Sequence, residues 1–264
     1  MINNLITIFV LTVIIHTAET LSYSLRLAGV RLNKIAVALS LTGMVVLVSR
    51  TANIIQAPLT ATFVDYAKTN PAFDPLSYLR IILFAASIGT IMAIILFPTF
   101  VNLWGRVISK LEVAGSLPKL LSSVTIGQLK NTRYYIRKPS LSLSQFRYLG
   151  IPKRFLFLNI IVTAIYTVGV LSSLYAAHLV PELSTTASQS SGLINGIATI
   201  LLTIFIDPQI GLITDRAINN EKYRDKLGKI YVLLMVSRFM GTLAAQLFIL
   251  PAAYFIAYAI KLIY

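Results

Sequence analysis

Residues 81–103 read IILFAASIGTIMAIILFPTFVNL and contain no charged side chain. The hydrocarbon core of a bilayer is about 30 Å thick, so a helix needs about 20 apolar residues to cross it. Backbone polar groups in lipid must satisfy one another, and a helix does this along its whole length. The stretch therefore predicts a transmembrane helix.

Five more stretches have the same character. The six predicted spans are 5–25, 35–63, 81–103, 155–180, 193–214 and 230–260. The chain of 264 residues is 56% hydrophobic and only 12% charged, about half the charged fraction of a soluble domain. This composition argues against a soluble globular enzyme and against a disordered tail. We therefore predict an all-α, polytopic membrane protein with about six transmembrane helices, in one integral membrane domain over residues 1–264.

The distribution of basic residues predicts how the spans are oriented. Of the 23 Lys and Arg residues, three lie in the first connection between spans, ten in the third and five in the fifth, whereas the second and fourth connections are nearly bare. Connections rich in Lys and Arg stay in the cytoplasm. We therefore expect both termini outside and the connection 105–154 in the cytoplasm.

The third connection differs from an ordinary loop, because it has no acidic residue after position 112 and aromatic side chains alternate with its cations. Residues 107–121 have the pattern of an amphipathic helix on the membrane surface. The cations that we expect to dock an anionic lipid headgroup are Lys130, Arg133, Arg137 and Lys138. Alternatively, these cations only fix the topology and attract anionic membrane lipids. We expect no nucleic-acid partner.

Four charged residues lie inside the spans, where each costs about 2.5–3.5 kcal/mol. They are Glu19, Arg50, Asp207 and Arg238. A shift of 188 residues places Glu19 on Asp207 and Arg50 on Arg238, which indicates a parallel repeat of two hairpins unless the match arises by chance. Asp207 and Arg238 lie at similar depths, so we expect an ion pair between them, either structural or functional. Pro208 removes a backbone donor there and predicts a broken helix that lines a cavity.

Amide side chains accompany both arginines. Asn53 and Gln56 follow Arg50 at successive spacings of three residues, which places all three on one helix face. Gln246 follows Arg238 by about two helical turns. We therefore expect an amide near each arginine, as part of a substrate-binding or coupling site.

Residues for other kinds of chemistry are scarce. The chain has no cysteine and only two histidines, which leaves little for metal sites. His16 and Glu19 share a helix face, but two ligands match no metal motif and we expect a hydrogen bond between them instead. The sequence lacks the motifs of zinc peptidases, serine hydrolases and nucleotide-binding loops. We therefore expect no metal, no cofactor and no enzymatic activity.

Two segments of the chain resemble a known family. They are HTAETLSYSLR at 16–26 and FIDPQIGL at 205–212, and together with the length and the six spans they are similar to the Amj family of alternate lipid II flippases. The resemblance implies a multi-pass protein of the bacterial cytoplasmic membrane. It also implies the movement of lipid II, an undecaprenyl pyrophosphate that carries the peptidoglycan precursor, from the inner to the outer leaflet.

Under this hypothesis the charged residues of the spans act on the cargo. Arg50 and Arg238 contact the pyrophosphate partway across the membrane, and Glu19 and Asp207 hold the arginines when no cargo is bound. The alternatives are a transporter of another anionic or amphipathic solute and a non-transporting membrane scaffold. Six helices are few for so large a headgroup, so either the chain pairs with itself or the headgroup travels along a groove open to lipid. We expect a homodimer, because closed twofold assemblies are the commonest.

Overall fold

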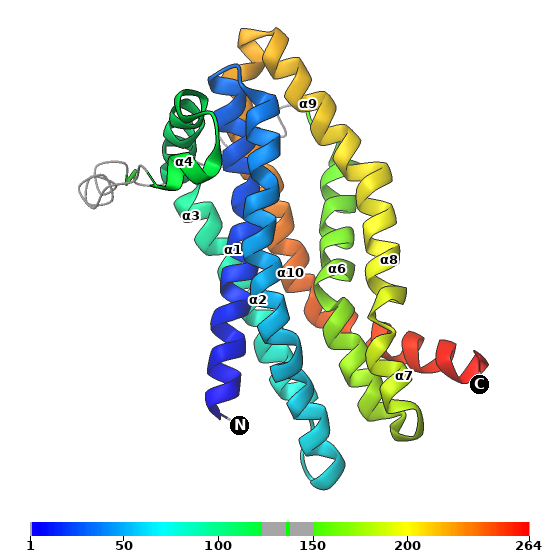
Figure 1. Cartoon of the computed structure of the whole chain (residues 1–264). Coiled ribbons are helices and arrows are strands. Elements are labelled where there is room, and N and C mark those ends of the chain that lie inside the picture. Colours follow the sequence, from blue (N-terminus) through cyan, green and yellow to red (C-terminus); the bar gives the residue numbers. More distant parts are fainter. Residues whose placement is uncertain (1, 123–135, 138–149, 264) are drawn as a thin grey trace.

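The computed structural model describes residues 2–122, 136–137 and 150–263, and all regular secondary structure in these ranges is helical (Figure 1). The first three long helices are α1 (Ile2–Arg31), α2 (Ile35–Thr69) and α3 (Leu76–Ala114). The next three units are α6 (Lys153–Leu179), the broken helix Pro181–Asn219 and α10 (Glu221–Ile263). All six are long and apolar enough to cross a bilayer, which confirms the predicted fold class.

The amphipathic segment after the third span is divided between two helices. Its first part continues α3 as far as Ala114. Gly115 ends α3 with a φ of +70°, a left-handed conformation that glycine adopts without strain. A short helix, α4 (Leu117–Ser122), then follows. The expectation of one surface helix over 107–121 is therefore wrong, because the chain turns at this glycine.

The fifth unit is irregular where Pro208 predicts a break. Its pieces are a 3₁₀ turn (Pro181–Leu183), α7 (Ser184–Gln189), α8 (Ser191–Leu201), a π-helical turn (Leu202–Ile206) and α9 (Asp207–Asn219). Pro208 lies in the first turn of α9, where a missing backbone N–H costs little. The widened π turn directly before it separates α8 from α9.

Two groups of helices make up the molecule. In the α1–α3 half, α1 packs along α2 and α3; in the α6–α10 half, α6 packs along α10 and α8. The two halves meet mainly where α3 runs beside α10. Contacts of α2 with the second half are sparse, so space is left between α2, α6 and α8.

Buried apolar side chains form two separate clusters. One includes Leu25 of α1 and Tyr231 of α10, near the α1–α2 turn. The other includes Ile8 of α1 and Phe63 of α2, near the chain's N-terminus. Between the clusters, about halfway along the helices, each half carries a layer of polar side chains.

The helices alternate in direction. In Figure 1 the α1–α2 turn, α4 and the α9–α10 turn lie at one end of the molecule, whereas both termini lie at the other end with the α2–α3 and α6–α7 connections. The described parts of the basic connections therefore share one end, as the charge pattern predicts. That this end faces the cytoplasm stays a prediction.

The last turns of α10 depart from the bundle. Pro251 lies inside α10, where it removes a helical hydrogen bond and favours a kink. Beyond it the helix leans sideways past α6 and α7, and the C-terminus lies to the right of the bundle in Figure 1. Tyr254, Phe255 and Tyr258 are exposed on this final segment.

Candidate functional site

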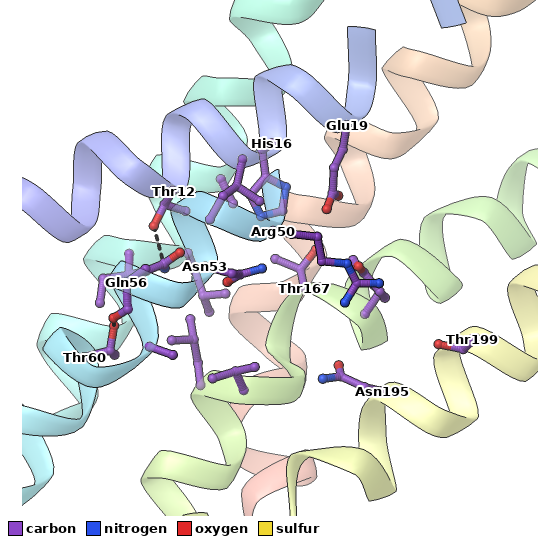
Figure 2. A pocket seen from close by; sticks show the side chains of 18 residues that line it. Thr12, His16, Glu19, Arg50, Asn53, Gln56, Thr60, Thr167, Asn195 and Thr199 are labelled. Atoms are coloured by element: carbon purple, nitrogen blue, oxygen red, sulfur yellow. Dashed lines mark hydrogen bonds between the residues drawn. The ribbon is translucent and has the colours of Figure 1, made fainter. Parts of the chain in front are cut away.

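A cavity of about 460 Å³ lies in the polar layer between the two apolar clusters (Figure 2). Helices α1, α2 and α3 of one half and α6 and α8 of the other half enclose it. Its polar lining residues are Thr12, His16, Glu19, Arg50, Asn53, Gln56, Thr60, Tyr166, Thr167, Asn195 and Thr199. The volume falls within the range of about 300–1,000 Å³ that is typical of small-molecule sites.

Helix α2 supplies the predicted stripe of polar residues. Arg50, Asn53 and Gln56 all line the cavity, which confirms that their spacing places them on one face. The Arg50 and Asn53 side chains are exposed, whereas Gln56 is buried and its Nε2 donates a hydrogen bond of 2.8 Å to the Thr12 hydroxyl of α1. The exposed cation and the exposed amide therefore lie at the accessible part of the cavity.

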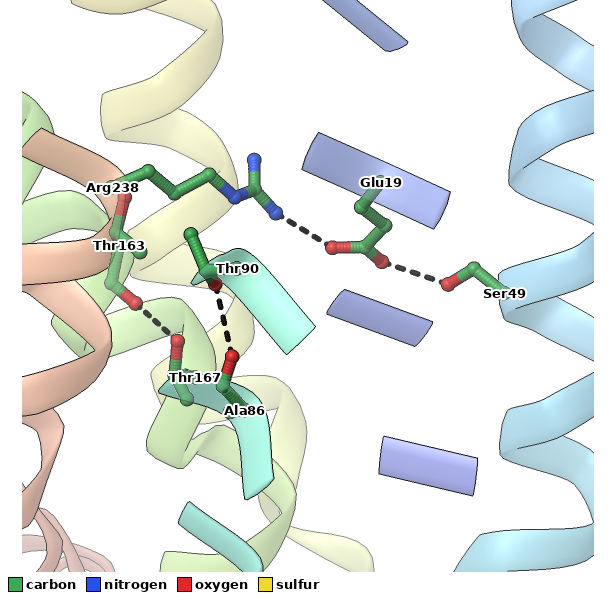
Figure 3. A network of polar contacts seen from close by, with 7 residues as sticks. All are labelled: Glu19, Ser49, Ala86, Thr90, Thr163, Thr167 and Arg238. Atoms are coloured by element: carbon green, nitrogen blue, oxygen red, sulfur yellow. Dashed lines mark hydrogen bonds and ion pairs between the residues drawn. The ribbon is translucent and has the colours of Figure 1, made fainter. Parts of the chain in front are cut away.

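An ion pair joins the two halves beside the cavity (Figure 3). The Arg238 guanidinium of α10 donates to Glu19 Oε2 of α1 at 2.7 Å, and both side chains are only 16% exposed. The Ser49 hydroxyl of α2 donates to the other carboxylate oxygen at 2.8 Å. Arg238 Nε is buried, and no described residue forms a hydrogen bond with it. Glu19 thus neutralises Arg238, while the neighbour of Ser49, Arg50, points into the cavity.

The predicted pair of Asp207 and Arg238 is wrong. Arg238 binds Glu19 instead, and Asp207 is exposed at the start of α9. Helices α9 and α10 do contact each other, through the Thr214 and Tyr231 hydroxyls at 2.8 Å. Equal depth along a hairpin fixes the height of a side chain but not the direction in which it points, and the direction decides the partner.

The amide predicted near Arg238 is also misplaced. Gln246 Nε2 donates to the backbone carbonyl of Arg80 on α3 at 2.9 Å, two helical turns from Arg238. This contact is a second polar link between the halves. It contributes to their packing and not to the ion pair.

Residues matched by the 188-residue offset occupy unlike surroundings. Glu19 is half-buried in an ion pair whereas Asp207 is exposed, and Arg50 is exposed whereas Arg238 is paired. The offset therefore does not predict equivalent roles for the matched residues.

Of the four cations predicted to dock an anionic headgroup, only one lies within the described residues. Arg137 is exposed, and its backbone N–H donates to the Thr99 hydroxyl of α3 at 3.0 Å. Lys130, Arg133 and Lys138 lie outside the described residues. Arg137 is thereby held beside the third transmembrane helix.

Two buried polar groups of the lining have no hydrogen-bond partner among the residues that the structure describes. His16 Nδ1 is one, although Glu19 shares its helix face, because the Glu19 carboxylate is occupied by Ser49 and Arg238. The other is Asn195 Oδ1 on α8, which sequence reasoning missed. An amide within an apolar span was the available signal. In the described part of the chain, no group of three His, Cys, Asp or Glu side chains could hold a metal ion.

A helical bundle with a polar cavity between two apolar layers defines a multi-pass membrane protein of the kind that holds a polar solute within the bilayer. The family model described as "Amj: Alternate to MurJ" matches residues 11–260, and the chain belongs to this family. A relative from Bacillus subtilis (strain 168), named Lipid II flippase Amj, is 42% identical over 257 residues, which cover 96% of each chain. No solved structure matches the chain.

Proposed function

We propose that the protein is a lipid II flippase, which moves the undecaprenyl-pyrophosphate-linked peptidoglycan precursor from the inner to the outer leaflet of the bacterial cytoplasmic membrane. The 42% identity to a relative that carries this name supports the proposal. The structural observation that carries it is the polar cavity halfway along six membrane-spanning helices, with Arg50 exposed inside it.

The cavity meets the physical requirement of the reaction. A charged headgroup cannot cross hydrocarbon unless polar groups replace its water. The lining offers a cation, amides and hydroxyls, and several lining residues, including Asn53, Tyr166 and Thr199, are exposed. Because the cavity reaches the molecular surface, the polyprenyl tail can stay in lipid while the headgroup moves through the protein.

The two arginines act differently on the pyrophosphate in this proposal. Arg50 makes no ion pair within the described residues, so its guanidinium can bind phosphate oxygens in a bidentate manner. Arg238 becomes available only when the anion displaces Glu19. Exchange of Arg238 between Glu19 and the cargo therefore couples occupancy of the cavity to the contact between the two halves.

The orientation belongs to the same proposal. We place the basic connections in the cytoplasm and both termini outside, so the cations of the third connection, including Arg137, gather the anionic lipid at the entry side. Single cysteines test this directly, because the chain has none of its own. A membrane-impermeant maleimide should label Ala72→Cys on intact cells, and should label Asn219→Cys only after the membrane is opened.

The central experiment is complementation of cells depleted of their main lipid II flippase. Arg50→Ala should fail to restore growth or the appearance of lipid II on the outer face, at unchanged protein level. Arg216→Ala, which removes an exposed arginine of α9 outside the cavity, should restore both. Full activity of Arg50→Ala would contradict the proposed role of the cavity.

Rival functions give different outcomes. A scaffold should tolerate loss of Arg50 and of the Glu19–Arg238 pair but not deletion of residues 130–154. A transporter of another solute should leave lipid II on the inner face even in the wild type. A homodimer, predicted because six helices are few for so large a headgroup, is checked by crosslinking in the membrane.

A further inference from the structure

The amide of Asn195 lies beside the cavity. The residue lines the cavity from α8, and its Oδ1 is buried with no hydrogen-bond partner among the described residues. Buried polar atoms in proteins nearly always have a partner. A water or ligand that enters the cavity is therefore the candidate partner for this amide.

The neighbouring helix is shaped to admit this side chain. A Cβ added at Gly169 of α6 would lie 1.8 Å from Asn195 Oδ1 and 2.5 Å from its Cγ. Any other residue at position 169 would force the amide to move. A Cβ at Gly196, on the same helix as Asn195, would meet nothing within 4 Å. The absence of a side chain at Gly169 thus leaves room for the amide in its present position.

A second amide group faces the cavity from the other half. Asn53 of α2 is exposed and lines the cavity, and in Figure 2 the Asn53 and Asn195 side chains extend from opposite sides toward the space between them. The Thr199 hydroxyl also lines this side. A neutral amide offers both donors and an acceptor, whereas a guanidinium only donates. The amides therefore match hydroxyl and acetamido groups and have no preference for an anion.

We infer that the cavity holds a second subsite, separate from Arg50, in which Asn53, Asn195 and Thr199 bind the hydroxyl and acetamido groups of a sugar attached to the pyrophosphate. This inference rests on the proposed function and deepens it. Arg50 recognises the pyrophosphate that all such lipids share. The amides distinguish a glycosylated polyprenyl pyrophosphate from a sugar-free one.

Binding of two lipids to the purified full chain tests the subsite. The probes are lipid II and undecaprenyl pyrophosphate, measured by titration in nanodiscs. Asn195→Ala should weaken lipid II binding about tenfold, the effect of one lost hydrogen bond to a ligand in a site built for it, and leave undecaprenyl pyrophosphate binding within about twofold. Arg50→Ala should weaken the binding of both. Gln209→Ala, an exposed amide of α9 outside the cavity, should change neither.

Gly169→Ala provides an independent variant, since it displaces the amide without removing it. It should reproduce the selective loss of lipid II binding, whereas Gly196→Ala should bind both lipids as the wild type does. Retained binding of undecaprenyl pyrophosphate shows that each variant is folded. Equal weakening of both lipids by Asn195→Ala, or no weakening of either, would overturn the subsite. A wild type that binds neither lipid would instead overturn the proposed function.

Discussion

The two halves of the molecule contribute unequally to the cavity. The α1–α3 half supplies its charged lining residues, Glu19 and Arg50, and its histidine, His16. The α6–α10 half supplies hydroxyl groups and the amide of Asn195. The arginine inside one of its spans, Arg238, is bound to Glu19 of the other half. The difference teaches that an arginine inside a span is paired or left open to a cavity according to the partner that packing brings to it.

The largest effect expected from this comparison is on stability. Arg238→Ala should lower the free energy of unfolding by about 3 kcal/mol, because it leaves the Glu19 carboxylate unpaired and largely buried. Arg50→Ala should cost less than about 0.5 kcal/mol, because Arg50 is exposed. Unfolding in mixed micelles with increasing SDS measures both. The double variant Glu19→Ala/Arg238→Ala should recover most of the lost free energy of unfolding. Equal costs for the two single arginine variants would contradict the distinction between a paired Arg238 and an exposed Arg50.

A smaller effect tests whether both halves are packed alike. A Cβ at Gly89 would lie 2.6 Å from the Val13 carbonyl oxygen, and a Cβ at Gly241 would lie 2.7 Å from the Ile160 carbonyl oxygen. Gly89→Ala and Gly241→Ala should each cost about 2 kcal/mol through overpacking. Gly43→Ala is the matched control, since its Cβ would meet nothing within 4 Å. A large cost in only one half would show that the halves differ in rigidity.

In each half, loss of one polar contact should lower the free energy of unfolding by up to about 1 kcal/mol, the strength of one hydrogen bond. Tyr231 is fully buried and its hydroxyl contacts Thr214, so Tyr231→Phe should cost about 1 kcal/mol. Thr12→Val removes the acceptor of Gln56 but should cost less, because Gln56 lines the cavity and water can replace the hydroxyl there. The same unfolding assay ranks the two. The reverse order would indicate that the cavity is dry.

The smallest effect concerns Asp207. Because its side chain is exposed, Asp207→Asn should change the free energy of unfolding by less than about 0.5 kcal/mol. Glu19→Gln, the equivalent change at the residue matched by the 188-residue offset, should be clearly more destabilising. Similar costs for the two variants would indicate that residues matched by the 188-residue offset have equivalent roles, contrary to their unlike surroundings in the structure.

Local periodicity predicted what depends on one helix. The six spans and the common face of Arg50, Asn53 and Gln56 follow from apolar length and from a spacing of three residues, and the structure confirms both. A π-helical turn does lie just before Pro208, near the predicted break. The prediction that this break lines the cavity is wrong, because neither the turn nor Pro208 is among the lining residues.

Contacts between distant helices could not be predicted in the same way. The partner of Arg238 is 219 positions away in sequence, and its choice depends on the rotation of α1 and α10 about their axes. The position of the Asn195 amide likewise depends on the space beside Gly169, which lies on a neighbouring helix. No pattern within one span encodes such a pair.

The kinked end of α10 has a consequence for the depth of the protein in the bilayer. Aromatic side chains favour the level of the lipid headgroups, and Tyr254 and Tyr258 are exposed beyond Pro251. At about 1.5 Å per residue, this aromatic segment begins roughly 24 Å along α10 from Arg238. By anchoring at the headgroup level, the segment sets how far below the lipid surface the cavity lies. Membranes of different thickness should change that depth and the turnover that depends on it.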